Sequence, residues 1–173
     1  MTESCASGNC PTCKVVVGAI PVVGRSRHLF ILYSEGDRHI VYRGGPEKNS
    51  KYAEAAAAGR AQEYKAAEAR EWDLGSGFGL LVTHRMVGLA RNPDYVAMTD
   101  QKTIAEGPEF CGLDPVLTMW TRRVGMAGRV YDLPNALGTD NSNATIRTIL
   151  RRAGLPEEKP DVWAPGWGSY VPL

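Results

Sequence analysis

The chain has 173 residues, of which 43% are hydrophobic and 23% are charged, a composition typical of a globular protein and not of a disordered one. Its formal net charge is +1 at pH 7, from 20 Lys and Arg against 19 Asp and Glu. This balance gives no overall electrostatic reason to expect nucleic acid or an acidic membrane as a partner, and no run of about 18 apolar residues predicts a transmembrane segment.

Residues 1–14, MTESCASGNCPTCK, have the composition of a weakly ordered leader. They lack a basic region followed by an apolar one, the pattern of a secretory signal, so we expect a cytoplasmic protein or one exported without a cleavable signal peptide. Cys5, Cys10 and Cys13 have a spacing typical of zinc ligands, but a closed zinc site needs a fourth ligand, which Cys111 or His28 would have to supply. The alternative that we favour is an exposed segment with reduced thiols, or its oxidised form with a disulfide between two of these N-terminal cysteines.

Strands are predicted through the first part of the domain. Residues 15–23, VVVGAIPVV, are apolar and β-branched, and Pro21 interrupts them. HLFILYS (28–34) and RHIVYRG (38–44) flank the short turn EGD, which predicts a β-hairpin. GGP at 44–46 is expected to end the second strand, because glycine and proline weaken strand continuation.

The middle of the chain mixes helix and strand patterns. Residues 50–72 are rich in Ala, Glu, Lys and Arg and predict a long surface helix, followed by a turn at LGSGFG (74–79). That turn lacks the third glycine of a phosphate-binding loop. Residues 80–90 predict a strand that runs into a turn or short helix, and YVAMT (95–99) is a candidate for a further short strand. Asp114 and Pro115 are good residues for a helix start, which predicts a helix over 114–128.

The segment DNSNATIRTILRRAGLP (140–156) predicts a short amphipathic helix that ends at Gly154 in a left-handed conformation. Its buried stripe is expected to comprise Ile146, Ile149, Leu150 and Ala153. Arg147, Arg151 and Arg152 could form a local basic patch, although such residues are typical of a solvated helix face. Strands precede helices, which predicts an α+β fold, with a single domain over 15–173 and helices packed against a small antiparallel sheet.

Three histidines are candidate bases. His28 opens its strand on the same face as Phe30 and Leu32, by the alternation of a strand, and is therefore partly sheltered. His39 lies at the turn end of the next strand, and His84 lies near the end of another. For a lone histidine beside apolar residues, a packed structural role is the more common one.

The helix entrance holds more small polar residues than one cap needs. Asp140 or Asn141 can cap the helix, which leaves Ser142 beside unpaired backbone N–H groups that stabilise a nearby anion. Serine becomes a nucleophile only with a general base in hydrogen-bonding reach, most plausibly His28. The alternative is that all of these residues only build the helix start.

HLFILYS…RHIVYRGGP resembles the histidine-bearing hairpin, and DNSNATIRTILRRAGL the later helix, of circularly permuted papain-like domains of the NlpC/P60 type. NSN is also similar to a GPNSNTF segment of bacterial families. The resemblance implies a permuted papain-like fold in which His28 is the base. Ser142 would stand where active members have cysteine, with Asn141 and Asn143 as orienting or oxyanion-contacting groups.

The position that orients the histidine is open, because Tyr42 or Arg43 lies nearly opposite His28, depending on the register. Three explanations are open for a serine where those enzymes have cysteine. A Ser–His pair replaces the Cys–His pair, the fold persists without catalysis, or the cysteine was replaced by engineering.

Two functions follow from these patterns. The first is a hydrolase of amide or ester bonds, acting on a peptidoglycan peptide, a protein or a lipid, and it is the one we expect. The second is a catalytically inactive binding module, supported by the missing cysteine and by an aromatic tail with Trp163, Trp167 and Tyr170. A zinc-dependent protein is a third class. A bacterial effector or a phage-related protein would suit this composition.

Overall fold

The structure is a computed structural model, and it describes residues 12–22, 25–47, 79–89, 92–131 and 140–173. The predicted helix over 50–72 lies outside these residues, as do Cys5 and Cys10.

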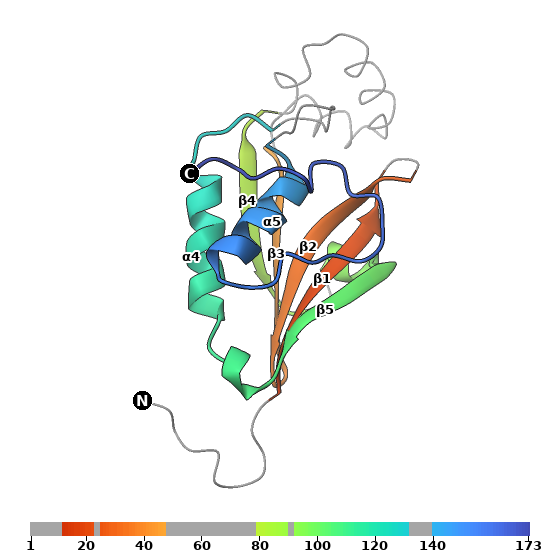
Figure 1. The fold of residues 1–173 in the computed structure, drawn as a ribbon, viewed down its shortest axis with the longest axis vertical. Coiled ribbons are helices and arrows are strands. Elements are labelled where there is room, and N and C mark those ends of the chain that lie inside the picture. The colour runs from red at the N-terminus through yellow and green to blue at the C-terminus, as the bar shows by residue number, and fades with distance from the viewer. Residues whose placement is uncertain (1–11, 23–24, 48–78, 90–91, 132–139) are drawn as a thin grey trace, which may run out of the picture.

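Five antiparallel strands form one sheet, in the order β4-β3-β2-β1-β5 (Figure 1). The strands are β1 (Cys13–Pro21), β2 (Arg27–Glu35), β3 (Arg38–Pro46), β4 (Leu81–Val87) and β5 (Asp100–Glu106). The predicted hairpin is confirmed as β2 and β3, joined by a tight turn and paired from Glu35–Arg38 to Ile31–Tyr42.

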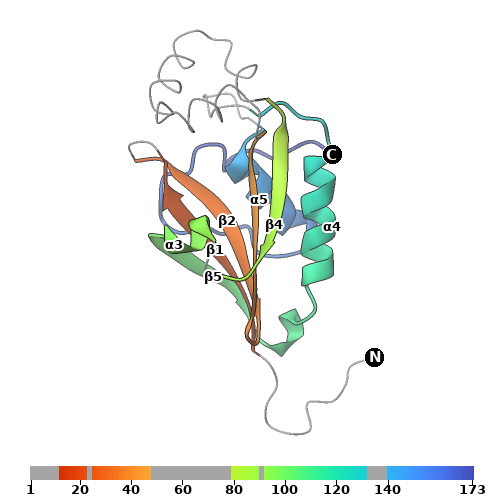
Figure 2. The same cartoon turned by 180° about the vertical axis from the view of Figure 1, so that it is seen from behind.

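The described helices lie on both faces of this sheet. They are α3 (Pro93–Val96), the short 3-10 helix η1 (Pro108–Phe110), α4 (Asp114–Gly125) and α5 (Ser142–Arg152). Helices α4 and α5 cover one face, and α3 lies on the other, as the reverse view shows (Figure 2). The α+β fold predicted from the sequence is therefore confirmed.

The strand predicted at 95–99 is wrong. Asn92 caps a helical turn there, because its Oδ1 accepts from the backbone N–H groups of Asp94 and Tyr95, and Pro93 follows in the first helical position. The strand comes next, as β5. Its sequence DQKTIAE is mostly polar because β5 is an edge strand with largely exposed side chains, and this polarity hides the strand pattern.

Alternation along the strands separates two apolar clusters. Leu29, Ile31 and Tyr33 of β2 face the helix layer, where they meet the buried stripe of α5. Phe30 and Leu32 face the other way and pack with Val16 and Val41. We call these the helix face and the back face of the sheet.

Asp114 anchors α4 to the sheet. It was expected near the cap of this helix, and it is the first residue of α4, where its carboxylate binds neighbouring side chains and makes no cap bond. It accepts two hydrogen bonds from Arg85, at 2.9 and 2.7 Å, one from Arg38 at 2.6 Å and one from Tyr42 at 2.6 Å. These bonds hold the start of α4 against β3 and β4.

A disulfide joins Cys13 at the start of β1 to Cys111, just before α4, across 98 residues of sequence. Together with Asp114 it fixes the segment that leads from the sheet into α4. None of the helices in the described ranges is long and apolar enough to span a bilayer.

Replacing both Cys13 and Cys111 with serine should lower the free energy of unfolding by about 2–5 kcal/mol, because the disulfide closes a loop of 98 residues in the unfolded chain. Urea denaturation of the variant and of the wild type measures the loss. The free energy of unfolding of the wild type in a thiol reductant should equal that of the double-serine variant without reductant. Equal stability of the oxidised wild type and the variant would contradict this role.

Asp114 should make the stability dependent on pH. Hydrogen bonds from Arg85 hold the pKa of Asp114 well below its usual range, and burial opposes them only in part. A carboxyl with a lowered folded pKa contributes stability above its unfolded pKa of about 3.9 and loses that contribution as the pH falls towards the folded value.

We therefore expect Asp114→Asn to reduce stability at pH 7 by about 2–4 kcal/mol, since it leaves Arg85 without its carboxylate. The difference from the wild type should shrink between about pH 5 and pH 2. Arg38→Gln, which removes a half-exposed partner, is the control and should cost less than about 1 kcal/mol. Parallel pH curves for the wild type and Asp114→Asn would refute the assignment.

Candidate functional site

The first residues of α5 form the centre of the candidate site. Asn141 caps the helix: its Oδ1 accepts from the backbone N–H groups of Asn143, at 2.9 Å, and Ala144, at 3.1 Å. Asp140 is bonded instead to Arg129, at 2.6 Å. Of the two capping residues that the sequence allows, the structure therefore uses Asn141. At the other end of the helix, Gly154 has the predicted left-handed conformation, with φ of 72°.

Asn143 joins α5 to the sheet. Its Oδ1 accepts from the backbone N–H of Leu29 at 2.8 Å, and its Nδ2 donates to the carbonyl oxygens of Arg27 and Pro165, both at 2.9 Å. Arg27 and Leu29 belong to the part of β2 that lies beyond its pairing with β3. The amide of Asn143 therefore takes the place of a neighbouring strand there.

The gap between β2 and β3 is filled by the first turn of α5. Thr145 packs directly on Gly44 of β3, where an added Cβ would lie 2.7 Å from the Thr145 hydroxyl oxygen. On the other side of the turn, Gly166 of the C-terminal segment lies against the Asn141 amide, where a Cβ would also clash. Glycine is therefore required at both contacts, because the backbone comes so close.

Ser142 is the first residue of α5, as the sequence suggests, but it is only 5% exposed. Its Oγ lies 3.5 Å from the hydroxyl of Tyr131, a long hydrogen bond. Among the described residues no hydrogen bond joins Ser142 to a histidine or a carboxylate.

His28 lies on the other side of the sheet. As predicted, it shares a face with Phe30 and Leu32, and this is the back face, whereas α5 covers the helix face. The side chain is 8% exposed, and its strand neighbour Ile20 also packs on the back face. The structure therefore does not bring His28 and Ser142 together.

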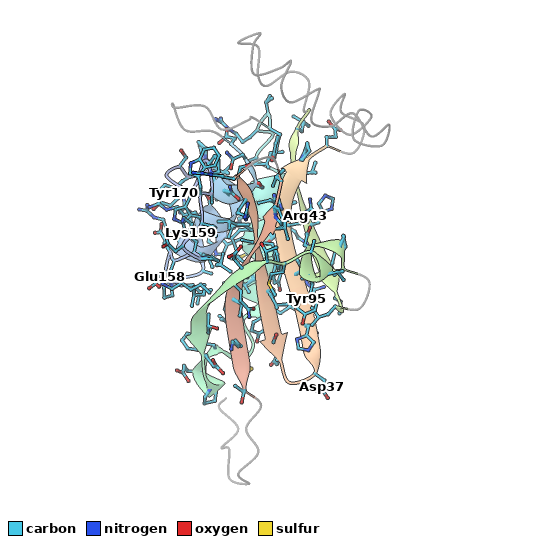
Figure 3. The ribbon with its side chains drawn as sticks, turned by 90° about the vertical axis from the view of Figure 1, so that its right-hand side faces the viewer. Asp37, Arg43, Tyr95, Glu158, Lys159 and Tyr170 are labelled. Carbon is cyan, nitrogen blue, oxygen red and sulfur yellow. A yellow bond between two sulfur atoms is a disulfide. The ribbon has the colours of Figure 1, made fainter. Side chains whose placement is uncertain are left out.

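The two residues considered as partners of His28 bind elsewhere. Tyr42 lies on the helix face and donates to Asp114, and burial followed by this bond raises the pKa of its hydroxyl. Arg43 lies on the back face and donates to both carboxylate oxygens of Asp94, at 2.8 and 3.0 Å. Figure 3 shows Arg43 on the opposite side of the sheet from Tyr170.

The other two histidines are apart from α5 as well. His39 Nδ1 lies 2.8 Å from the Ser34 hydroxyl, within the hairpin. His84 pairs with Arg43 across β3 and β4. Loss of solvation and then the Arg43 charge lower the pKa of His84, while Asp94 opposes them.

The N-terminal zinc prediction is wrong for Cys13, because its sulfur is bonded to Cys111 and cannot act as a thiolate ligand. In the described ranges, the group of side chains with metal-like spacing is Cys13, Cys111 and Glu35, whose ligand atoms lie within 4.8 Å of one another. With both sulfurs in the disulfide, only the Glu35 carboxylate of this group can bind a cation.

Replacing each of the three polar residues with alanine should lower the free energy of unfolding, and the loss should follow the number of hydrogen bonds that the side chain makes. Asn143→Ala removes the partners of a backbone N–H and two carbonyls and should cost about 3 kcal/mol or more. Asn141→Ala loses a cap, at about 0.5–2 kcal/mol. Ser142→Ala removes one long bond and should cost about 1 kcal/mol or less. Thermal and urea unfolding of the three variants measures this order, and a Ser142→Ala loss larger than that of Asn143→Ala would contradict it.

No protein-family model, curated protein or solved structure matches this chain, so the interpretation of the site depends on its own geometry.

Proposed function

We propose that the chain is a binding module that does not hydrolyse amide or ester bonds at Ser142. The observation that carries this proposal is the use of the α5 start as a joint between β2, β3 and the C-terminal segment. A histidine-bearing hairpin followed by a helix that begins in NSN is in keeping with a permuted papain-like domain without catalysis.

The chemistry of a serine nucleophile supports the same proposal. Ser142 needs a base within about 2.6–3.2 Å, and His28 lies on the other face of the sheet. An oxyanion needs free donors, but both N–H groups of the Asn143 amide are already donated to carbonyl oxygens. Asn141 accepts from two backbone N–H groups through its side-chain oxygen. The remaining obstacle is the burial of Ser142, which keeps a substrate carbonyl away.

A hydrolase of a peptide, glycopeptide or lipid substrate is the second candidate. It is favoured by one observation: Ser142 begins α5, where the helix dipole stabilises a developing anion, and the Tyr131 hydroxyl lies near its Oγ. For either function, the disulfide favours an exported protein, such as a bacterial effector or a phage-related protein, over a cytoplasmic one.

A fluorophosphonate probe separates the two candidates, because it reacts with serines that a base has activated. We expect no adduct on the folded wild-type protein, measured by intact mass. A known serine hydrolase is the positive control for the probe. An adduct that disappears in Ser142→Ala but persists in Ser169→Ala, the matched control in the C-terminal segment, would overturn the proposed function.

A further inference from the structure

Arginine side chains gather on the outer surface of α4 and α5 around two aromatic rings. Arg123 and Arg152 lie over the Trp120 ring, at 4.9 and 5.6 Å from its centroid. Arg147 and Arg151 lie over the Tyr170 ring, at 4.4 and 4.5 Å. We call the following set the arginine surface: Trp120, Arg122, Arg123, Arg147, Arg151, Arg152 and Tyr170.

The members of this surface come from three segments. Trp120 and Arg123 belong to α4, Arg152 reaches the same ring from α5, and Tyr170 lies in the C-terminal segment beside α5. Arg152 extends from the last turn of α5 towards Trp120 of α4, and Arg151 extends from the same turn to Tyr170. The two stacked groups therefore adjoin at the end of α5 and form a strip from α4 to the C-terminal segment. Figure 1 shows α4 and α5 side by side in one layer.

The strip carries a local excess of positive charge. Glu157 is the carboxylate bonded to it, accepting from Arg147 at 2.7 Å and from the Tyr170 hydroxyl. Throughout the described ranges, Arg123, Arg151 and Arg152 have no carboxylate within ion-pairing distance, and all three are exposed. The net charge of +1 for the whole chain conceals this segregation.

The stacking prepares these guanidinium groups to bind an anion. A guanidinium held over a ring has a restricted orientation, so less side-chain entropy is lost when it binds. Arg147 already donates to Glu157 and to the Trp167 carbonyl. Among the described residues Arg123, Arg151 and Arg152 make no such hydrogen bond, so their N–H groups can donate, two at a time, to a phosphate. The strip contains arginine and no lysine, which fits bidentate recognition.

We propose that the arginine surface binds single-stranded nucleic acid, a partner class that deepens the proposed binding function and rests on it. Successive phosphates would accept from Arg123, Arg152 and Arg151 along the strip. The bases would stack on the outer faces of the guanidinium groups and on the exposed parts of the rings. Cations and aromatic groups spread over three segments fit a flexible polyanion better than they fit a single small anion.

A bilayer is the competing partner, because Met119 of α4 and Met126, which caps its end, are 41% and 84% exposed near Arg122 and Arg123. Two apolar side chains at one short helix and its end bury little area in a bilayer, while the stacked arginines extend beyond them onto α5 and the C-terminal segment. The strip therefore favours nucleic acid, and vesicles form a separate arm of the test.

The test uses the full chain with fluorescein-labelled oligo(U) RNA and oligo(dT) DNA of about 20 nucleotides, and anisotropy at several salt concentrations. The surface variant is Arg123→Gln/Arg151→Gln/Arg152→Gln. The matched control is Lys14→Gln/Arg25→Gln/Lys102→Gln, which removes the same charge from half-exposed or exposed positions elsewhere. Thermal unfolding checks that both variants are folded.

We expect wild-type binding that weakens with salt, and a loss of about tenfold or more in the surface variant. The slope of log K against log salt should fall by about 2, because three phosphate contacts are removed at about 0.7 each. The control should stay within about twofold of the wild type. This pattern supports the arginine surface as a nucleic-acid site.

Three outcomes would overturn the inference. The first is that the wild type does not bind the oligonucleotides at low salt. The second is that both variants lose the same oligonucleotide affinity. The third is that the wild type binds phosphatidylglycerol vesicles or a poly-glutamate peptide but not the oligonucleotides. Each of these leaves the proposed function standing if the fluorophosphonate probe gives no adduct. An adduct on Ser142 overturns the proposed function whatever the oligonucleotides show.

Discussion

The side-chain amide of Asn143 is the interaction on which the rest of the structure depends. Strands β2 and β3 separate beyond Ile31–Tyr42, and the backbone groups of Arg27 and Leu29 would be buried without partners if nothing replaced the missing strand. Asn143 satisfies both groups and also binds the C-terminal segment through Pro165. One amide therefore fixes the position of α5, the opening of the sheet and the path of the chain after α5.

The second helix of the layer is fixed by charge and by a covalent bond. Asp114 holds α4 against β3 and β4 through Arg85, Arg38 and Tyr42, and the Cys13–Cys111 disulfide ties the segment before α4 to the edge of β1. With both helices placed, their outer sides meet, and one arginine from each helix lies over the shared Trp120 ring. The arginine surface is thus a consequence of how α4 and α5 pack.

The same packing changes the meaning of the polar residues at the start of α5. A helix start that presents a nucleophile must leave it accessible and leave donors free. In this chain Asn141 caps the helix, Asn143 completes the sheet and Ser142 is buried between them. The surplus of small polar residues is explained by a structural joint, and the surface that we propose for binding lies on the solvent-facing side of the helix layer.

The sequence by itself determined the hairpin, the extent of α5, its end at Gly154 and the shared face of His28, Phe30 and Leu32, because alternation, caps and turn residues act over a few neighbouring positions. It did not identify β5, whose exposed edge position gives it a polar pattern.

Only the tertiary structure decided which face of the sheet α5 covers, and therefore that His28 and Ser142 are separated. It also decided the Asn143 bonds, which span 114 and 116 residues, the pairing of Cys13 with Cys111, and the clustering of arginines. Contacts between segments so far apart leave no local pattern in the sequence.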